Sequence, residues 1–372
     1  MPEEILLSYL PNTVKQRAEM LKSIGVGSID ELFQDIPIQF RSPQINLPDP
    51  LSELDLKREL THTGTLNVNA SDHACFLGAG FYNHFIPSVV GRIISRGEFA
   101  TSYTPYQPEV AQGTLQATYE FQSLICLLFE MEVANAGMYD GATALAEAAL
   151  MACRVTGRNR ILALDTISPT DYRVLQTYAI PQGLIVESIS TQITVIPNDT
   201  ACLLVQHPNF YGYLEDMENL RNLTKSQEAL LVMSMNPISM GMIRPPGAYD
   251  ADIAVSEGQP LGIPLNFGGP SVGLFTCKQQ FLRQMPGRIV GRTTDTHGKT
   301  GYVLTLQTRE QHIRRERATS NICTSEALLN LATASYLGAL GPQGIRQVAE
   351  LCYHKAHYLA SQIASLPNFS YL

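Results

Sequence analysis

Six short apolar runs alternate with amphipathic segments between residues 135 and 277. The runs are RILALD (160–165), GLIVESIS (183–190), ACLLVQHP (201–208), LLVMSM (230–235), DIAVSEG (252–258) and SVGLFTC (271–277). Continuous apolar strands separated by helices are typical of a largely parallel sheet covered on both faces. The last connection is too short for a crossover helix, so we expect the final strand to run antiparallel. The pattern predicts an α/β fold.

The flanking sequence indicates two further parts. Residues 1–64 combine helical patterns with a proline-rich stretch, and Ser28 followed by Glu31 is a capping-box pattern. Residues 324–372 are helical and apolar-periodic. We therefore expect an N-terminal helical and extended segment (1–64), a large domain (65–323), and the start of a truncated C-terminal small domain (324–372).

Charge and cysteine spacing exclude several classes of protein. The formal net charge is −8 and only seven lysines are present, whereas a duplex nucleic-acid binder needs clustered Lys and Arg. No apolar run approaches the roughly 20 residues that span a bilayer. The seven cysteines are scattered, and Cys126, Cys202 and Cys277 lie in apolar runs. We predict a cytoplasmic protein without disulfides that binds neither nucleic acid nor membrane.

Metal and nucleotide motifs are missing from the sequence. His354 and His357 are three residues apart on a predicted helix, but no third ligand is in register. No GxGxxG or GxxxxGK[ST] pattern occurs. We therefore predict no metal site and no dinucleotide or Walker-type site.

A phosphate-binding helix start is one interpretation of residues 138–148. Asp140, Gly141, Ala142 and Thr143 stand at the predicted start of a helix, where free backbone N–H groups attract anions. The alternative is a capped helix whose alanines pack tightly on the sheet. The residues themselves favour neither interpretation.

Two further stretches carry groups suited to binding. Tyr103, Tyr106 and Gln107 lie in an extended, proline-containing segment, which suits a planar cofactor or small substrate, or simply anchors a surface loop. Arg309, His312 and Arg314 belong to a basic run in an acidic protein. Such a run indicates an anion or acidic-partner site, although interspersed glutamates also fit a solvated face. The following TSN (319–321) is a phosphate contact or an N-cap.

Long motifs in order along nearly the whole chain carry a family resemblance. They are residues 9–37, FLGAGFYNHFIPSVV (76–90), TSYTPYQPEVAQGTLQATYEFQSLI (101–125), MYDGATALAEA (138–148), EGQPLGIPLNFGGPSVG (257–273), MPGRIVGRTTD (285–295) and LQTREQHIRRERATSNICT (306–324). Together they resemble the glycine cleavage system P-protein, glycine decarboxylase. The resemblance is to its N-terminal half, which in many bacteria is a separate alpha subunit.

The resemblance implies an aspartate-aminotransferase-like (fold type I) pyridoxal-phosphate-dependent transferase fold, with a mostly parallel seven-stranded sheet. It also implies one subunit of glycine dehydrogenase (aminomethyl-transferring), inactive alone. In that reaction glycine forms an external aldimine and loses carbon dioxide, and its aminomethyl group passes to the lipoyl arm of H-protein. The implied partners are glycine, lipoylated H-protein and a P-protein beta subunit in an α2β2 assembly.

In the family, the lysine that holds pyridoxal phosphate lies in the beta subunit or C-terminal half. Alignment of the Ile-Pro and Gly-Gly-Pro landmarks puts Gln259 near that lysine's place, and an amide cannot form a Schiff base. Enzymes of this fold also keep an Asp near the end of one central strand. Here that strand carries Met233, Met235 and Asn236. The resemblance therefore implies that the chain's own cofactor pocket, with the cradle at 140–143, is vestigial.

The resemblance further implies that this chain completes the partner's site. Thr319, Ser320 and Asn321 are expected to reach the phosphate of the cofactor held by the beta subunit. A channel for glycine or the lipoyl arm is expected to be lined by Tyr82, Asn83, His84, Tyr103, Tyr106, Gln107, Arg309, His312 and Arg314.

Two alternatives stay open. In the first, the chain is an independent pyridoxal-phosphate enzyme with a displaced lysine. Lys278 and Lys299 are the candidates for that lysine, although Lys299 lies in a hairpin-turn composition. In the second, the chain is a non-catalytic scaffold that stabilises the beta subunit. The polar, tyrosine-rich loops argue against a scaffold, which needs apolar contact surface.

Overall fold

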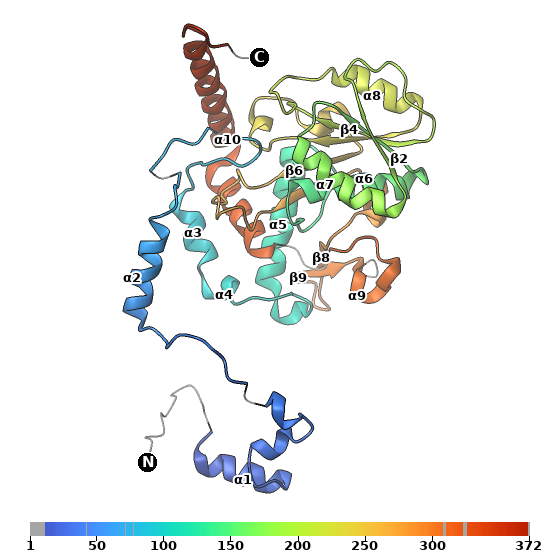
Figure 1. Cartoon of the computed structure of the whole chain (residues 1–372). Helices are drawn as coiled ribbons and strands as arrows, with labels where there is room; N and C mark the ends of the chain where they lie inside the picture. The colour runs from blue at the N-terminus through green and yellow to red at the C-terminus, as the bar shows by residue number, and fades with distance from the viewer. Residues whose placement is uncertain are drawn as a thin grey trace. The chain divides into compact units, whose positions relative to one another are not determined.

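The computed structural model describes residues 12–41, 43–70, 72–76, 78–307, 310–322 and 326–370 (Figure 1). The chain divides into two compact units, Met1–His73 and Ala74–Leu372. The boundaries that we predict at residues 64 and 323 stay predictions.

Short helices make up the first unit. They are α1 (Val14–Ile24), α2 (Glu53–Gly64) and the 3-10 helices η1 (Asp30–Phe33) and η2 (Ile38–Phe40). The predicted cap at Ser28 is present, because its hydroxyl accepts a hydrogen bond from the Glu31 N–H at 3.3 Å. The helix that follows is a single 3-10 turn rather than an α-helix.

A seven-stranded sheet forms the centre of the second unit, in the order β1-β7-β6-β5-β4-β2-β3. The strands are β1 (Val133–Ala134), β2 (Arg160–Leu164), β3 (Ile185–Ile189), β4 (Thr200–Gln206), β5 (Leu230–Ser234), β6 (Ile253–Glu257) and β7 (Gly273–Cys277). β2 to β6 pair in parallel, and β7 runs antiparallel to β6. The six predicted strands, the antiparallel last strand and the mostly parallel sheet are confirmed.

β1 has no counterpart among the predicted runs. It is two residues long and pairs antiparallel with β7, so that Val133 stands opposite Cys277. A strand of two residues has no measurable hydrophobic period. Pairing with a strand far along the chain decides its conformation, and only the tertiary structure supplies that partner.

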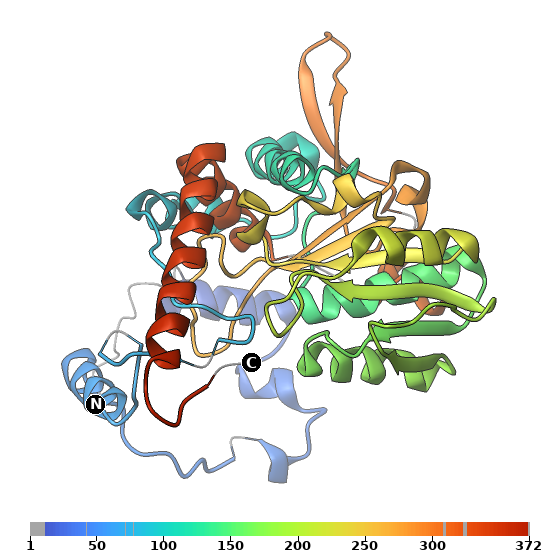
Figure 2. The same ribbon diagram turned by 90° about the horizontal axis from the view of Figure 1, so that it is seen from above.

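Helices cover both faces of the sheet, as predicted. α6 (Gly141–Thr156) and α7 (Pro169–Ala179) pack together on one face, and α8 (Met217–Ser226) lies on the other (Figure 2). α5 (Gln112–Phe129) packs against β1 and β7. Small buried side chains such as Ala144 and Ala148 let α6 approach several strands closely.

Shorter elements connect this framework. They are α3 (Ser88–Ile94), α4 (Gly97–Ala100), η3 (Pro108–Val110), η4 (Ile180–Gln182), η5 (Ser239–Gly241), η6 (Pro246–Tyr249), η7 (Gln279–Gln284), α9 (Gln311–Arg314) and η9 (Arg315–Arg317). β8 (Ile289–Thr294) and β9 (Thr300–Thr305) form a projecting hairpin (Figure 2). The two predicted C-terminal helical stretches are both helical and together make up α10 (Ala327–Ala364). It is kinked at Gly341, where φ is 62° and Pro342 follows.

The carboxyl ends of β4, β5 and β6 meet the amino end of α6 at one edge of the sheet. Ligand sites of open α/β sheets lie outside this edge. Lys278 follows the antiparallel β7, so it lies at the opposite edge, where its ammonium contacts Asp250 at 2.7 Å and Asp252 at 2.8 Å. Across the described ranges, no helix is both long and apolar enough to cross a membrane.

Candidate active site

Gln259 is almost fully buried in the loop after β6, with 1% of its surface exposed. Its Oε1 accepts a hydrogen bond from the Tyr82 N–H at 2.9 Å. Its Nε2 donates to the Tyr82 carbonyl at 2.9 Å and to the Ile263 carbonyl at 2.8 Å. The amide therefore clamps the backbone of the loop at 82–84, and its hydrogen-bonding groups are engaged with the main chain.

His84 attaches the same loop from a second side. Its Nδ1 lies 3.2 Å from the Tyr82 carbonyl, and its Nε2 accepts from the Gly262 N–H at 3.3 Å. The ring meets Tyr336 edge-on at 6.0 Å. Burial lowers the pKa of His84, which agrees with a neutral ring that donates from Nδ1 and accepts at Nε2. The exposed Asn83 lies between these two anchored residues.

The side-chain carboxylate of Glu257 occupies the start of α6. Asp140 caps the helix, since its Oδ1 accepts from the Thr143 N–H at 2.7 Å. The Gly141 N–H, which as the first of the helix has no partner within it, donates to Glu257 Oε2 at 2.9 Å. Glu257 Oε1 accepts from the Gln259 N–H at 2.8 Å and from the Ser271 hydroxyl. A carboxylate thus lies where an anion bound to this helix terminus would lie.

Two physical features follow from this position of Glu257. A Cβ at Gly141 would lie 2.7 Å from the Glu257 backbone nitrogen, so only glycine allows the helix to approach β6 this closely. Burial raises the pKa of Glu257 from an ordinary value of 4.5 to about 7, and the three hydrogen bonds that the carboxylate accepts oppose the rise.

The end of β5 carries no acid, as the sequence predicts. Met233 and Met235 are buried, and the Asn236 side chain accepts from the Ile238 N–H at 2.9 Å. On the neighbouring strand end, His207 is buried and accepts at Nδ1 from the Glu215 N–H at 3.2 Å. Its Nε2 lies 3.4 Å from the Tyr249 hydroxyl. Burial lowers the pKa of His207 and favours the neutral ring.

Tyr106 and His312 come together from distant parts of the chain. Their rings meet edge-on at 5.6 Å. Arg288, which is buried, donates to the Tyr106 hydroxyl at 2.9 Å. The buried Glu310 carboxylate lies 3.5 Å from His312 Nδ1 and 3.7 Å from Arg288 Nε. We refer to Tyr106, Arg288, Glu310 and His312 as the Arg288 cluster.

The other predicted channel residues lie around this cluster. Tyr103 is exposed and lines a cavity of about 260 Å³ together with Arg288. Gln107 precedes η3, and Arg314 ends α9. Arg309 lies outside the described residues. The structure therefore brings Tyr106 and His312 into contact, while Gln259 holds the loop at 82–84.

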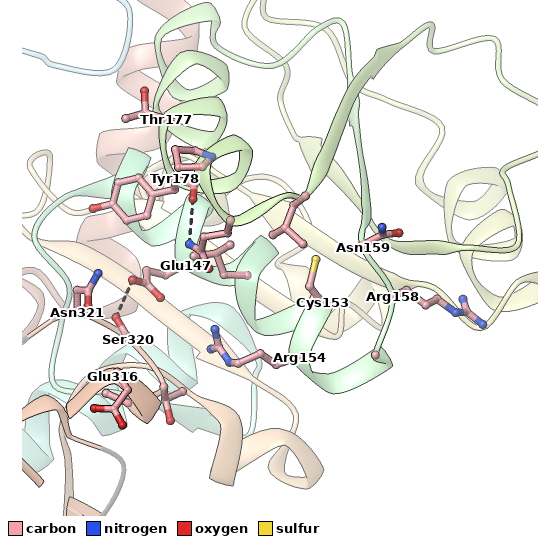
Figure 3. Close-up of a pocket in the computed structure, with 17 residues that line it drawn as sticks. Glu147, Cys153, Arg154, Arg158, Asn159, Thr177, Tyr178, Glu316, Ser320 and Asn321 are labelled. Carbon is pink, nitrogen blue, oxygen red and sulfur yellow. Dashed lines mark hydrogen bonds between the residues drawn. The ribbon is translucent and has the colours of Figure 1, made fainter. Parts of the chain in front are cut away.

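The predicted phosphate-contact segment lines a groove of about 840 Å³ beside α6 (Figure 3). Thr319, Ser320 and Asn321 all contribute to this groove. The Ser320 hydroxyl donates to Glu147 Oε1 at 2.6 Å. Glu147 is 5% exposed, and its Oε2 has no hydrogen-bond partner among the described residues. Burial raises the pKa of this carboxyl, although the Ser320 hydrogen bond opposes the rise.

Several site residues are missing from the sequence interpretation. They are Glu147, His207, Glu257, Ser271, Arg288 and Glu310. Each is a polar residue inside an apolar or mixed stretch, and that placement is the one local signal that could have found them. Their partners are remote in sequence, so no spacing rule predicts the contacts.

The sheet order, the helices on both faces and the site at the carboxyl edge define a class. It is the aspartate-aminotransferase-like fold of type I pyridoxal-phosphate-dependent transferases. A sphingosine-1-phosphate lyase of Burkholderia pseudomallei shares this fold with a TM-score of 0.58 at 14% identity, over 89% of this chain and 79% of that chain. The predicted fold class is confirmed.

The particular family follows from closer similarity. The family model of the glycine cleavage system P-protein matches residues 7–370, and the chain belongs to this family. A probable glycine dehydrogenase (decarboxylating) subunit 1 of Thermomicrobium roseum is 52% identical over 373 residues, covering 97% of this chain and 83% of the relative. A crystal structure of glycine decarboxylase (P-protein) of the glycine cleavage system, in inhibitor-bound form, matches with a TM-score of 0.89. It is 43% identical and covers 97% of this chain and 85% of that one.

Proposed function

We propose that this chain is the alpha subunit of a heteromeric glycine dehydrogenase (decarboxylating) and completes an active site whose cofactor the beta subunit holds. One observation carries the proposal: Gln259, at the place expected for the cofactor lysine, is a buried amide bound to Tyr82 and Ile263. It has no amine for covalent attachment, and its amide oxygen and both amide hydrogens are engaged with the main chain.

The residues at the carboxyl edge do not fit pyridoxal phosphate. An incoming phosphate at the start of α6 would meet the Glu257 carboxylate, which already accepts the Gly141 N–H. The pyridine nitrogen would face Met235 and Asn236 instead of an acid. The chain therefore departs from a cofactor site in three independent ways: the amide of Gln259, the carboxylate of Glu257 and the missing acid at the end of β5. We derive no chemical step through the cofactor on this chain.

The role that we assign to this chain is positioning at a shared site. The hydroxyl and amide groups of Thr319, Ser320 and Asn321 are donors suited to a phosphate held by the partner. The channel for glycine or the lipoyl arm of H-protein is assigned to Tyr82, Asn83, His84, Tyr103, Tyr106, Gln107, Arg309, His312 and Arg314. With the beta subunit, the enzyme would release carbon dioxide from glycine and transfer the aminomethyl group to H-protein. An α2β2 assembly in the cytoplasm belongs to the same proposal.

The geometry disfavours an independent enzyme with a displaced lysine. Lys278 lies at the wrong edge of the sheet and is paired with Asp250 and Asp252. Lys299 is exposed in the projecting hairpin. Borohydride trapping of pyridoxal phosphate on either lysine of the purified chain would restore this alternative.

The proposal is tested by mixing the chain with its beta subunit, pyridoxal phosphate and labelled glycine, and by measuring exchange of carbon dioxide. We expect exchange only when both subunits are present. Thr319→Ala with Asn321→Ala should weaken cofactor affinity. The matched control, Thr194→Ala with Asn198→Ala, changes the same residue types at exposed positions before β4. Equal activity of the two double variants would contradict the assigned role of the 319–321 segment.

A scaffold makes a different prediction in the same assay. If alanine replaced all the assigned channel residues together and full activity remained, the chain would serve only to stabilise the beta subunit. The polar surface of the channel residues argues for the opposite result, because obligate subunit contacts are predominantly apolar.

A further inference from the structure

The Arg288 cluster is built around a charged side chain to which the family resemblance assigns no role. Arg288 is 6% exposed, and its guanidinium carbon lies 5.1 Å from the centre of the Tyr106 ring. It also donates from Nη2 to the Tyr106 hydroxyl at 2.9 Å. One arginine thus fixes both the face and the hydroxyl of a tyrosine that is 43% exposed.

The backbone beneath Arg288 is held rigidly. The Ala136 N–H donates to the Arg288 carbonyl at 2.7 Å, and Asn135 Nδ2 donates to the Pro286 carbonyl at 2.9 Å. A Cβ at Gly287 would lie 2.8 Å from Asn135 Nδ2, and φ of this glycine is 76°. The arginine therefore starts from a backbone with little freedom.

The charge pair beneath the surface is not optimised for stability. Arg288 Nε and Glu310 Oε2 are 3.7 Å apart, and neither atom has a hydrogen-bond partner among the described residues. Burying two charges whose facing atoms make no hydrogen bond costs more than such a loose ion pair returns. A costly buried pair under an exposed Tyr106–His312 pair indicates a functional role.

The direction of the hydrogen bond decides what Tyr106 offers to a ligand. Arginine has only donors, so the Tyr106 oxygen is the acceptor from Arg288. The hydrogen of the phenol is therefore not used in this contact, and the side chain that carries it is partly exposed. Tyr106 becomes an oriented donor, and an oxygen anion is the ligand that such a donor fits best.

We propose that Arg288 is a positioning residue that presents the Tyr106 hydroxyl as a hydrogen-bond donor to the carboxylate of the amino-acid substrate, with Glu310 holding the Arg288 and His312 side chains in place. This inference rests on the proposed function and deepens it, because it gives Tyr106 a specific role in the channel, the binding of glycine. The lipoyl arm of H-protein carries no carboxylate at its reacting end, so its binding is independent of this donor.

The first experiment uses the isolated chain and needs no activity. A double-mutant cycle compares Arg288→Met, Tyr106→Phe and the double variant by chemical unfolding. A hydrogen bond to a charged donor predicts a coupling of about tenfold in the unfolding equilibrium constant. If Arg288→Met does not fold, Arg288→Lys takes its place in the cycle. Coupling of less than about twofold would overturn the contact on which the proposal stands.

The second experiment uses the enzyme reconstituted with its beta subunit. Tyr106→Phe and Arg288→Lys should each raise the KM for glycine about tenfold and leave the KM for H-protein unchanged, and the double variant should be no worse than Tyr106→Phe. Tyr119→Phe, whose ring lies against Tyr302, is the matched control. Multiplied effects in the double variant, or equal changes in both KM values, would overturn the proposal. Loss of wild-type activity on mixing would instead refute the proposed function, while the cycle on the isolated chain would still report on the contact.

Discussion

Substitution of Gln259 by Leu tests what the buried amide does in this fold. Leucine keeps a similar volume and removes all three hydrogen bonds to Tyr82 and Ile263. A buried donor or acceptor that loses its partner costs about 1–3 kcal/mol. Tyr82 is 40% exposed, so water can reach its two groups when the loop moves, whereas Ile263 is fully buried. We therefore expect the free energy of unfolding to fall by about 2–4 kcal/mol, less than three full penalties.

Two measurements on the purified chain check this magnitude. Urea unfolding gives the loss of stability, and amide hydrogen exchange of Tyr82 reports whether the loop at 82–84 is released. Gln347→Leu is the matched control, because Gln347 is exposed on α10 and its replacement should change stability by less than about 0.5 kcal/mol. If Gln259→Leu cost no more than this control and Tyr82 exchanged at the wild-type rate, the amide would not hold the loop. Gln259 would then have no structural role at this loop.

Three further predictions concern the carboxylates beside the site. Because Glu257 has a raised pKa in the folded state, its ionisation opposes folding: the chain loses about 3 kcal/mol of stability from this group as pH rises from 4.5 to about 7. Glu257→Gln should remove that part of the pH dependence. The stability of the wild type relative to the variant, followed by urea unfolding, should therefore fall as pH rises across this window and be independent of pH below it. Gln259→Lys should still bind no pyridoxal phosphate covalently, since Glu257 fills the start of α6; a borohydride-stable mass increase on Lys at 259 would contradict this. Glu147→Gln keeps an acceptor for Ser320 and should preserve activity with the beta subunit, whereas Glu147→Ala should lower cofactor affinity severalfold in an equilibrium titration. Equal affinities of these two variants would show that the Glu147–Ser320 contact does not position the 319–321 segment.

Much of the fold could be predicted because its signals are local. Each long strand is a continuous apolar run, and α6, α7 and α8 each begin at a side-chain cap, so burial and hydrogen bonding within the segment agree. The antiparallel β7 follows from a connection too short for a helix. β1 escaped prediction because two residues have no period, and η1 is shorter than its capping pattern predicts.

The candidate site, like the fold, could be predicted only in part. The resemblance indicated Tyr106 and His312, and the structure brings their rings together. The buried groups that contact them, Arg288 and Glu310, lie inside the motifs at 285–295 and 306–324, but the order of residues gave no sign of their contacts. A buried charge is recognised by its neighbours in space, and those neighbours come from separate loops.

The sequence by itself determined the class of the fold, the family and the presence of an amide at position 259, because each depends on residue types in order along the chain. Only the tertiary structure decided what that amide does, since Gln259 and Tyr82 are 177 residues apart. The same holds for Glu257 at the Gly141 N–H, 116 residues away, and for Arg288 at Tyr106, 182 residues away. Hydrogen bonds need donor and acceptor within about 3 Å. That proximity is created by the packing of the sheet, its helices and the loops at the carboxyl edge, and sequence spacing does not encode it.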